Sequence, residues 1–175
     1  MVRLVSMPAV LVTRTYLELR DPGRLLPVEL SDPDAYVERV AACPAAFFRF
    51  LYTAVGAQHH WVDRLSRTDD EIRAYLARPD ISFWVMYRQG APAGYFELRR
   101  DTDAVEIVYF GLLPEFVGRG LGKALLTVAV RRAFELGAAR VWLHTCTLDH
   151  PAALPNYLAR GFRPFKTETY EVVMA

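Results

Sequence analysis

Apolar and polar positions alternate in several short stretches of the chain, and turn residues bound each stretch. This alternation is typical of strands that bury one face. It predicts strands over residues 10–19, 81–88, 93–100, 105–113, 139–147 and 163–173. The strands that start at residues 81, 93 and 105 are joined by short connections, which favours an antiparallel meander.

Other stretches have their apolar residues at helical spacing or carry helix-start signals. Thr68-Asp69-Asp70-Glu71 is a capping box, so a helix should run from there to about Arg78. Further helices are predicted over 45–55 and 121–136, with shorter ones from Pro33, over 61–66 and from Pro151. This order of elements predicts an α/β (α+β) fold, in which residues 1–175 form a single domain with a mixed, mostly antiparallel sheet and helices on both faces.

Composition narrows the classes of function. The 21 basic and 20 acidic residues give a net charge of +1, so nucleic acid is not an expected partner. Residues 1–11 lack the pattern of a leader peptide, and no stretch approaches the ~20 apolar residues of a membrane helix. We therefore expect a cytoplasmic protein, with Cys43 and Cys146 as reduced thiols.

A glycine-rich loop, Val117 to Lys123, lies between a predicted strand and a predicted helix. The unpaired N–H groups at a helix start attract phosphate, and glycine lets it come close. A Walker-type nucleotide loop does not fit, because Ala124 follows Lys123 and supplies no hydroxyl for magnesium. A dinucleotide fingerprint does not fit either, because the spacing is Gly-x-Gly-x-Gly.

The loop resembles the acyl-coenzyme A-binding motif of the GNAT superfamily of N-acyltransferases, Gln/Arg-x-x-Gly-x-Gly/Ala. Gly120 and Gly122 match it, with Val117 in the Gln/Arg position. The resemblance implies a GNAT-like fold and acetyl-coenzyme A as the acyl donor, with no metal. It implies that the donor is bound by Phe110, Gly111, Leu112, Leu113, Val117, Gly118, Arg119, Gly120, Leu121, Gly122, Lys123 and His150, the last standing where many members have an asparagine.

The neighbours of the loop extend the resemblance to catalysis. Glu106 is spaced from the loop as the catalytic glutamate is in histone acetyltransferase-type members, and it is our candidate base. Partial burial would raise its pKa, and so would Glu97 on the neighbouring strand, the second candidate. Tyr157, four residues before Gly161, stands where many members have a general acid. The resemblance also implies an oxyanion-binding N–H near Phe110, where Gly111 would mark an irregular strand.

In this superfamily the segment before the meander builds the acceptor pocket, and here residues 35–78 are rich in aromatic side chains. This favours a small, partly apolar amine, with a peptide as the other option. The sequence predicts an N-acetyltransferase whose acceptor amine attacks directly. Two alternatives stay open: a non-catalytic module that binds acyl-coenzyme A, and a transferase to a hydroxyl acceptor. Monomer and homodimer are both compatible with the sequence.

Overall fold

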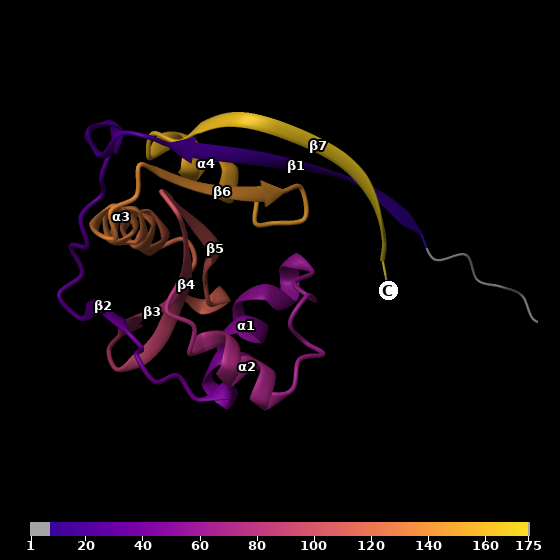
Figure 1. The fold of residues 1–175 in the computed structure, drawn as a ribbon, viewed down its shortest axis with the longest axis horizontal. Coiled ribbons are helices and arrows are strands. Elements are labelled where there is room, and N and C mark those ends of the chain that lie inside the picture. Colours follow the sequence, from indigo (N-terminus) through magenta and orange to yellow (C-terminus); the bar gives the residue numbers. More distant parts are fainter. Residues whose placement is uncertain (1–7, 175) are drawn as a thin grey trace, which may run out of the picture.

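The computed structural model describes residues 8–174, which form a seven-stranded sheet in the order β2-β3-β4-β5-β6-β1-β7 (Figure 1). Neighbouring strands are antiparallel except β5 and β6, which are parallel. The mixed, mostly antiparallel sheet predicted from the sequence is therefore confirmed. The strands are β1 (Ala9–Leu19), β2 (Ala35–Arg39), β3 (Ile81–Arg88), β4 (Ala91–Asp101), β5 (Ala104–Leu112), β6 (Arg140–Cys146) and β7 (Arg163–Val173).

Helices cover both faces of the sheet, as the sequence predicts. One core joins α3 (Leu121–Glu135) and α4 (Ala153–Ala159) to one face, through residues such as Leu98, Leu125 and Tyr157. The other core joins α1 (Ala45–Gly56) and α2 (Asp69–Leu76) to the opposite face. The predicted capping box is present, with Thr68 and Glu71 each bonding the other's main-chain N–H. Three short 3₁₀ helices complete the elements of the described residues: η1 (Pro22–Arg24), η2 (Ala57–His59) and η3 (Pro114–Phe116).

The sheet opens between its two parallel strands. β5 and β6 pair only through Ala104 with Arg140, Val105 with Val141 and Glu106 with Trp142, and beyond Glu106 they diverge. On its other side β5 stays paired with β4, but the register shifts because Val108 is an extra residue between Ile107 and Tyr109. A bulge of this kind bends a strand. The bend carries β5 away from β6, which leaves one of its edges unpaired.

Two predicted helices are absent. Pro33 begins a turn that leads into β2, because residues 35–39 pair with β3 and Tyr36 stacks on Tyr87. The segment 61–66 forms turns, because its side chains make long-range contacts: Arg64 bonds Glu97, and Trp61 packs against Tyr109. In both places tertiary contacts override a weak local signal.

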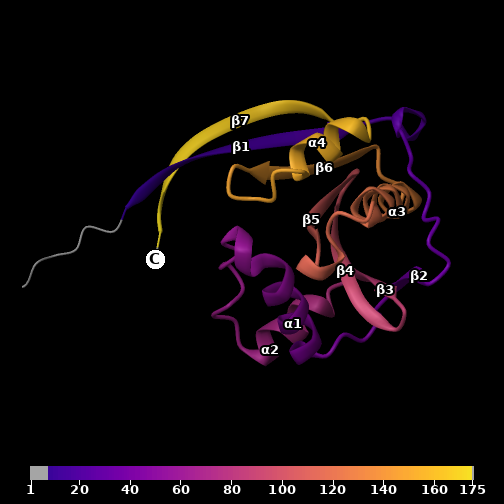
Figure 2. The ribbon, with the colours of Figure 1, turned by 180° about the vertical axis from the view of Figure 1, so that it is seen from behind.

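The β1–β7 pair extends as a two-stranded ribbon past the end of β6 (Figure 2). Among the described residues, no helix has the length and apolarity that crossing a bilayer requires. The prediction that residues 1–11 are not a leader peptide falls largely on residues 1–7, which lie outside the described range. Both cysteines are free thiols, as predicted.

Candidate active site

A cavity of about 1260 Å³ lies where β5 leaves β6. Its lining comes from β5, the loop before α3, the loop after β6, α4, and the segment 59–67 that follows α1. Arg14, in the middle of β1, and Tyr170, Val172 and Val173, at the end of β7, add to the lining of the cavity. It is therefore an elongated space that reaches from the start of α3 to the β1–β7 ribbon.

At one end of this cavity the main chain offers a row of N–H donors. Gly118 and Gly120 have φ angles of 82° and 79°, a left-handed conformation that glycine adopts without strain. Within residues 8–174, no group accepts a hydrogen bond from the N–H groups of residues 118–123. These donors meet the positive end of the α3 dipole, so together they form an anion-binding cradle.

The cavity gathers most of the residues predicted to bind the donor. Phe110, Gly111, Leu112, Val117, Gly118, Gly120, Gly122, Lys123 and His150 all line it. Leu113 and Leu121 do not; both side chains are buried in the cores. Arg119 is also outside the lining, and its guanidinium lies over the ring of Phe116. Arg119 and Leu121 can therefore contribute their main chain to the cradle, whereas the N–H of Leu113 is bonded to the carbonyl of Ala93.

Glu106 lies in the cavity wall, just where β5 and β6 part. Its side chain is 6 % exposed and accepts a hydrogen bond from Arg99, its cross-strand partner on β4. Burial raises the pKa of the Glu106 carboxyl; Arg99 opposes this effect, while the nearby negative charge of Glu97 adds to it. A carboxylate with a raised pKa that borders a cavity is a reasonable proton acceptor.

Glu97, the second candidate base, is in a different situation. It faces Tyr109 across the β4–β5 pair, has no exposed surface and does not line the cavity. Both carboxylate oxygens are bonded to Arg64, at 2.5 and 2.9 Å, and one also accepts from the Tyr75 hydroxyl. Its lone pairs are occupied by protein donors. The geometry therefore indicates a structural role for Glu97. Of the two candidate bases, Glu106 is the one that a ligand in the cavity can contact.

Gly111 is not the site of the strand irregularity, contrary to the prediction. The bulge is at Val108, three residues earlier. Gly111 serves packing instead: a Cβ at this position would lie 2.5 Å from Cγ1 of Val55 on α1. Its missing side chain lets α1 approach β5 closely and so sets the width of the cavity at this point.

The chain's relationship to known proteins agrees with this geometry. The model of the acetyltransferase (GNAT) family matches residues 48–162, which is more than half of the chain. The chain belongs to the GNAT acetyltransferase family. No curated protein shows significant sequence similarity to it.

Several solved structures share the GNAT fold of this chain. A GCN5-related N-acetyltransferase from Kribbella flavida superposes with a TM-score of 0.66 at 22% identity, over 93% of this chain and 58% of that one. A second, from Sphaerobacter thermophilus, has a TM-score of 0.66 at 15% identity, over 92% and 52%. This chain thus spans little more than half the length of these two.

A third similar structure is a metagenomic soil aminoglycoside acetyltransferase, meta-AAC0020, in complex with trehalose. Its TM-score is 0.63 at 17% identity, over 74% of this chain and 88% of that one. At such low identity these three likenesses show the shared GNAT fold.

The last two residues that the sequence predicts for the site, Tyr157 and His150, lie on α4 and just before it. Tyr157 is buried next to Phe110, and burial, with a smaller effect from Asp149, raises the pKa of its hydroxyl, so it stays protonated at neutral pH. His150 lines the cavity, and its Nδ1 accepts from the N–H of Ala152. Asn156, which the sequence analysis did not single out, donates to the carbonyl of Gly122, and its buried Oδ1 has no partner among residues 8–174. In the sequence, the position of Asn156 directly before Tyr157 is the signal that could have marked it as a site residue.

Proposed function

We propose that this GNAT chain transfers an acetyl group from acetyl-coenzyme A to a primary amine, which attacks the thioester directly. The observation that carries the proposal is the unpaired row of N–H donors over residues 118–123, at one end of a cavity that Glu106 and Tyr157 also line. The N–H groups suit a diphosphate, and the unpaired edge of β5 suits an extended polar arm. The buried, unpartnered Oδ1 of Asn156 supplies an acceptor for an amide N–H of that arm.

Bound acetyl-coenzyme A would supply an electrophilic thioester carbonyl. The Glu106 carboxylate accepts the proton of the acceptor's ammonium group, either directly or through a water. A main-chain N–H on the unpaired edge of β5, near Phe110, stabilises negative charge on the carbonyl oxygen; such a donor contributes on the order of 3 kcal/mol. The Tyr157 hydroxyl donates its proton to the departing sulfur.

Direct attack is favoured over a relay through a cysteine. Cys146 lines the cavity, but burial, and then the charge of Asp149, raises the pKa of its thiol. At neutral pH it is therefore a protonated thiol and a poor nucleophile. Cys43 is on the far side of α1's core, outside the cavity lining.

Coenzyme A binding tests the proposal. At a hundredfold excess over its dissociation constant a ligand adds ~2.7 kcal/mol of stability, which a thermal-shift assay detects. We expect coenzyme A and acetyl-coenzyme A to protect the chain, and ATP and NAD to protect it less. Protection by ATP or NAD without protection by coenzyme A would contradict the proposal.

A matched pair of glycines tests the cradle itself. Gly118→Ala and Gly137→Ala both place a side chain at a left-handed residue, with φ of 82° and 84°, and neither new Cβ has a neighbour within 4 Å. The strain should be similar, roughly 1–2 kcal/mol each. Gly118 precedes α3 and lines the cavity, whereas Gly137 follows α3 at its other end. Only Gly118→Ala should weaken coenzyme A binding in calorimetry; equal losses would argue against the cradle.

A further inference from the structure

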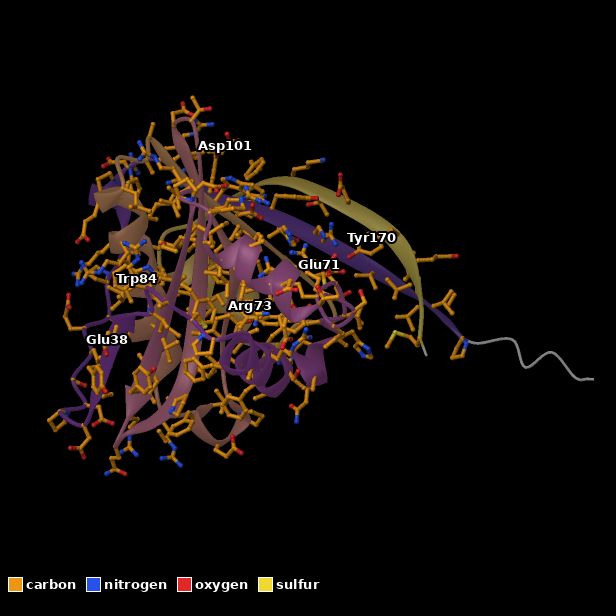
Figure 3. The ribbon with its side chains drawn as sticks, turned by 60° about the horizontal axis from the view of Figure 1, so that its bottom comes forward. Glu38, Glu71, Arg73, Trp84, Asp101 and Tyr170 are labelled. Atoms are coloured by element: carbon orange, nitrogen blue, oxygen red, sulfur yellow. The ribbon has the colours of Figure 1, made fainter. Side chains whose placement is uncertain are left out.

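The far half of the cavity has its own polar arrangement, which the donor does not use. On the sheet side it is lined by Arg14, His144 and Tyr170, from β1, β6 and β7. Figure 3 labels Tyr170 on the β1–β7 ribbon. On the opposite side it is lined by Trp61, Val62, Asp63 and Arg67, from the segment between α1 and α2. An acceptor that enters this half meets these side chains.

Arg14 is a half-buried cation that forms no ion pair with any residue of the described range, 8–174. Its Nη2 donates to the Tyr170 hydroxyl at 2.9 Å, and its Nε is buried with no partner among the described residues. Glu168 is directly opposite Arg14 in the β1–β7 register, where a charge pair would be natural. Its carboxylate is instead bonded to the Tyr16 hydroxyl at 2.8 Å and to Lys166. Arg14 thus turns from its cross-strand carboxylate towards Tyr170 and the cavity.

The other charges in the cavity wall are largely compensated. Arg64 is paired with Glu97, and Arg99 with Glu106. Asp149 accepts from the Thr145 hydroxyl, the Cys146 N–H and, at 3.4 Å, the indole N–H of Trp61. What remains in the cavity wall is positive charge at Arg14, Arg67, Lys123 and Arg160 and negative charge at Asp63. Within residues 8–174, the one side-chain hydrogen bond of Asp63 is a 3.4 Å bond from the Tyr109 hydroxyl.

The uncompensated charge in the cavity wall is mainly positive. This argues against a polycationic acceptor, because such a ligand needs several free carboxylates. Arg14 has no carboxylate partner within residues 8–174, and a guanidinium matches a ligand carboxylate, which accepts two bonds at once. Partial desolvation by the surrounding groups, and then the nearby Arg14, lowers the pKa of the His144 imidazole, so His144 adds no competing charge at neutral pH. Trp61, Val62 and Leu148 give the same half of the cavity an apolar character.

We propose that the acceptor is an amine that also carries a carboxylate, in its simplest form an apolar amino acid, and that Arg14 with the Tyr170 hydroxyl binds that carboxylate. The amine's acetylation rests on the proposed function, but binding of the carboxylate does not. A single ammonium group can be held by Asp63 or reach Glu106, since both line the same cavity.

Calorimetry with matched ligands tests this carboxylate site. The probes are L-phenylalanine and L-leucine, their decarboxylated counterparts phenethylamine and isopentylamine, and the polycation spermine, all titrated in the presence of coenzyme A. The full chain should bind each amino acid at least tenfold more tightly than its decarboxylated counterpart, and spermine more weakly than either. Equal affinity within each pair, or tightest binding of spermine, would overturn the proposal.

Variants of the chain assign the preference to Arg14. Arg14→Gln should abolish the amino acid's advantage while it changes the affinity for the decarboxylated amine less than twofold. Arg14→Lys, which keeps the charge but loses the fork, should retain part of the advantage. Arg67→Gln removes a cation from the same cavity, and Glu168→Gln alters the cross-strand neighbour; each should leave the preference within threefold. If Arg67→Gln abolishes it and Arg14→Gln does not, the assignment is wrong.

The outcome is independent of the donor. If coenzyme A fails to bind but the Arg14-dependent preference persists, the proposed function fails and the carboxylate site stands. If coenzyme A binds and the preference is missing, the carboxylate site fails and the proposed function stands.

Discussion

Two glutamates on neighbouring strands, each with an arginine, make an instructive comparison. Glu97 on β4 and Glu106 on β5 are both nearly inaccessible, at 0 % and 6 % exposure. The difference is in the partners: Arg64 is 6 % exposed, whereas Arg99 is 42 % exposed. In one ion pair both side chains are buried and only the arginine borders the cavity. The other pair is at the boundary between protein and solvent.

The buried pair holds the fold together over a long sequence distance. Arg64 comes from the segment after α1, binds both oxygens of Glu97, and also donates to the Tyr75 hydroxyl on α2. Burial would lower the pKa of Arg64, but Glu97 raises it above its ordinary value, so the pair stays charged. Its effect is to fix the segment that forms one side of the cavity.

In the pair at the boundary, Glu106 with Arg99, the carboxylate can still accept a proton from a ligand. Glu106 accepts from Arg99 through one oxygen, Oε2, and it lines the cavity, which Glu97 does not. A base needs an available lone pair and access to the proton it removes. The comparison teaches that burial alone does not distinguish a structural carboxylate from a reactive one; the number of donors already bound to it does.

The largest expected effect follows from removing the boundary carboxylate. Glu106→Gln should reduce kcat/KM by about 10²- to 10⁴-fold, the usual contribution of a general base. Coenzyme A affinity should not change. The melting temperature at pH 8 should hold or rise, because a raised folded-state pKa means that ionisation of Glu106 disfavours the folded state. Steady-state assays with an amine that the wild-type chain acetylates, with calorimetry and melting curves, measure all three.

Two results would contradict the roles assigned here. Retained turnover in Glu106→Gln would mean that another group removes the proton. A wild-type chain that binds coenzyme A but acetylates no amine would indicate the non-catalytic alternative. The matched variant Glu97→Gln should instead lower the melting temperature, since it disturbs a satisfied buried pair.

The sequence predicted the features that rest on local signals. The glycines at positions 118 and 120, the capping box at Thr68 and the periodicity of β3, β4 and β5 each reflect a few adjacent residues. Glu106 was proposed from its spacing to the loop, and the structure places it in the cavity wall; its role as the base stays a prediction.

The features that the sequence did not predict depend on long-range contacts. The Arg64–Glu97 pair joins residues 33 positions apart, and without it the segment 61–66 resembles a helix. The bulge at Val108 depends on the register with β4, so the glycine at 111 was a misleading guide. Arg14 gains its significance only because Glu168 is engaged elsewhere, which no spacing rule reveals.

The next effect in size concerns stability. Arg64→Met leaves Glu97 buried without its cation and should cost about 3–5 kcal/mol of the free energy of unfolding. Arg99→Met breaks a pair whose arginine is 42 % exposed and therefore screened by solvent, and it should cost about 1 kcal/mol. For a chain of this size, each kcal/mol lowers the melting temperature by about 2–4 °C. Thermal and urea melts of both variants measure the two losses in the free energy of unfolding. Similar small losses in the two variants would contradict the difference between the two ion pairs.

The smallest effect, and the most specific, is a shift in pH dependence. Arg99 opposes the rise in the pKa of Glu106 that burial causes, so Arg99→Gln should raise that pKa further. The reactive form is the ionised carboxylate; hence the acidic limb of kcat/KM should move to higher pH, with the plateau unchanged. An exposed pair contributes about 0.2–1 kcal/mol and one pKa unit is about 1.4 kcal/mol, so the shift should be below one unit. Arg100→Gln, one residue along β4 and outside the cavity lining, is the control and should not shift the limb. A limb that moves to lower pH, or that moves equally in the control, would mean that Arg99 does not tune the base.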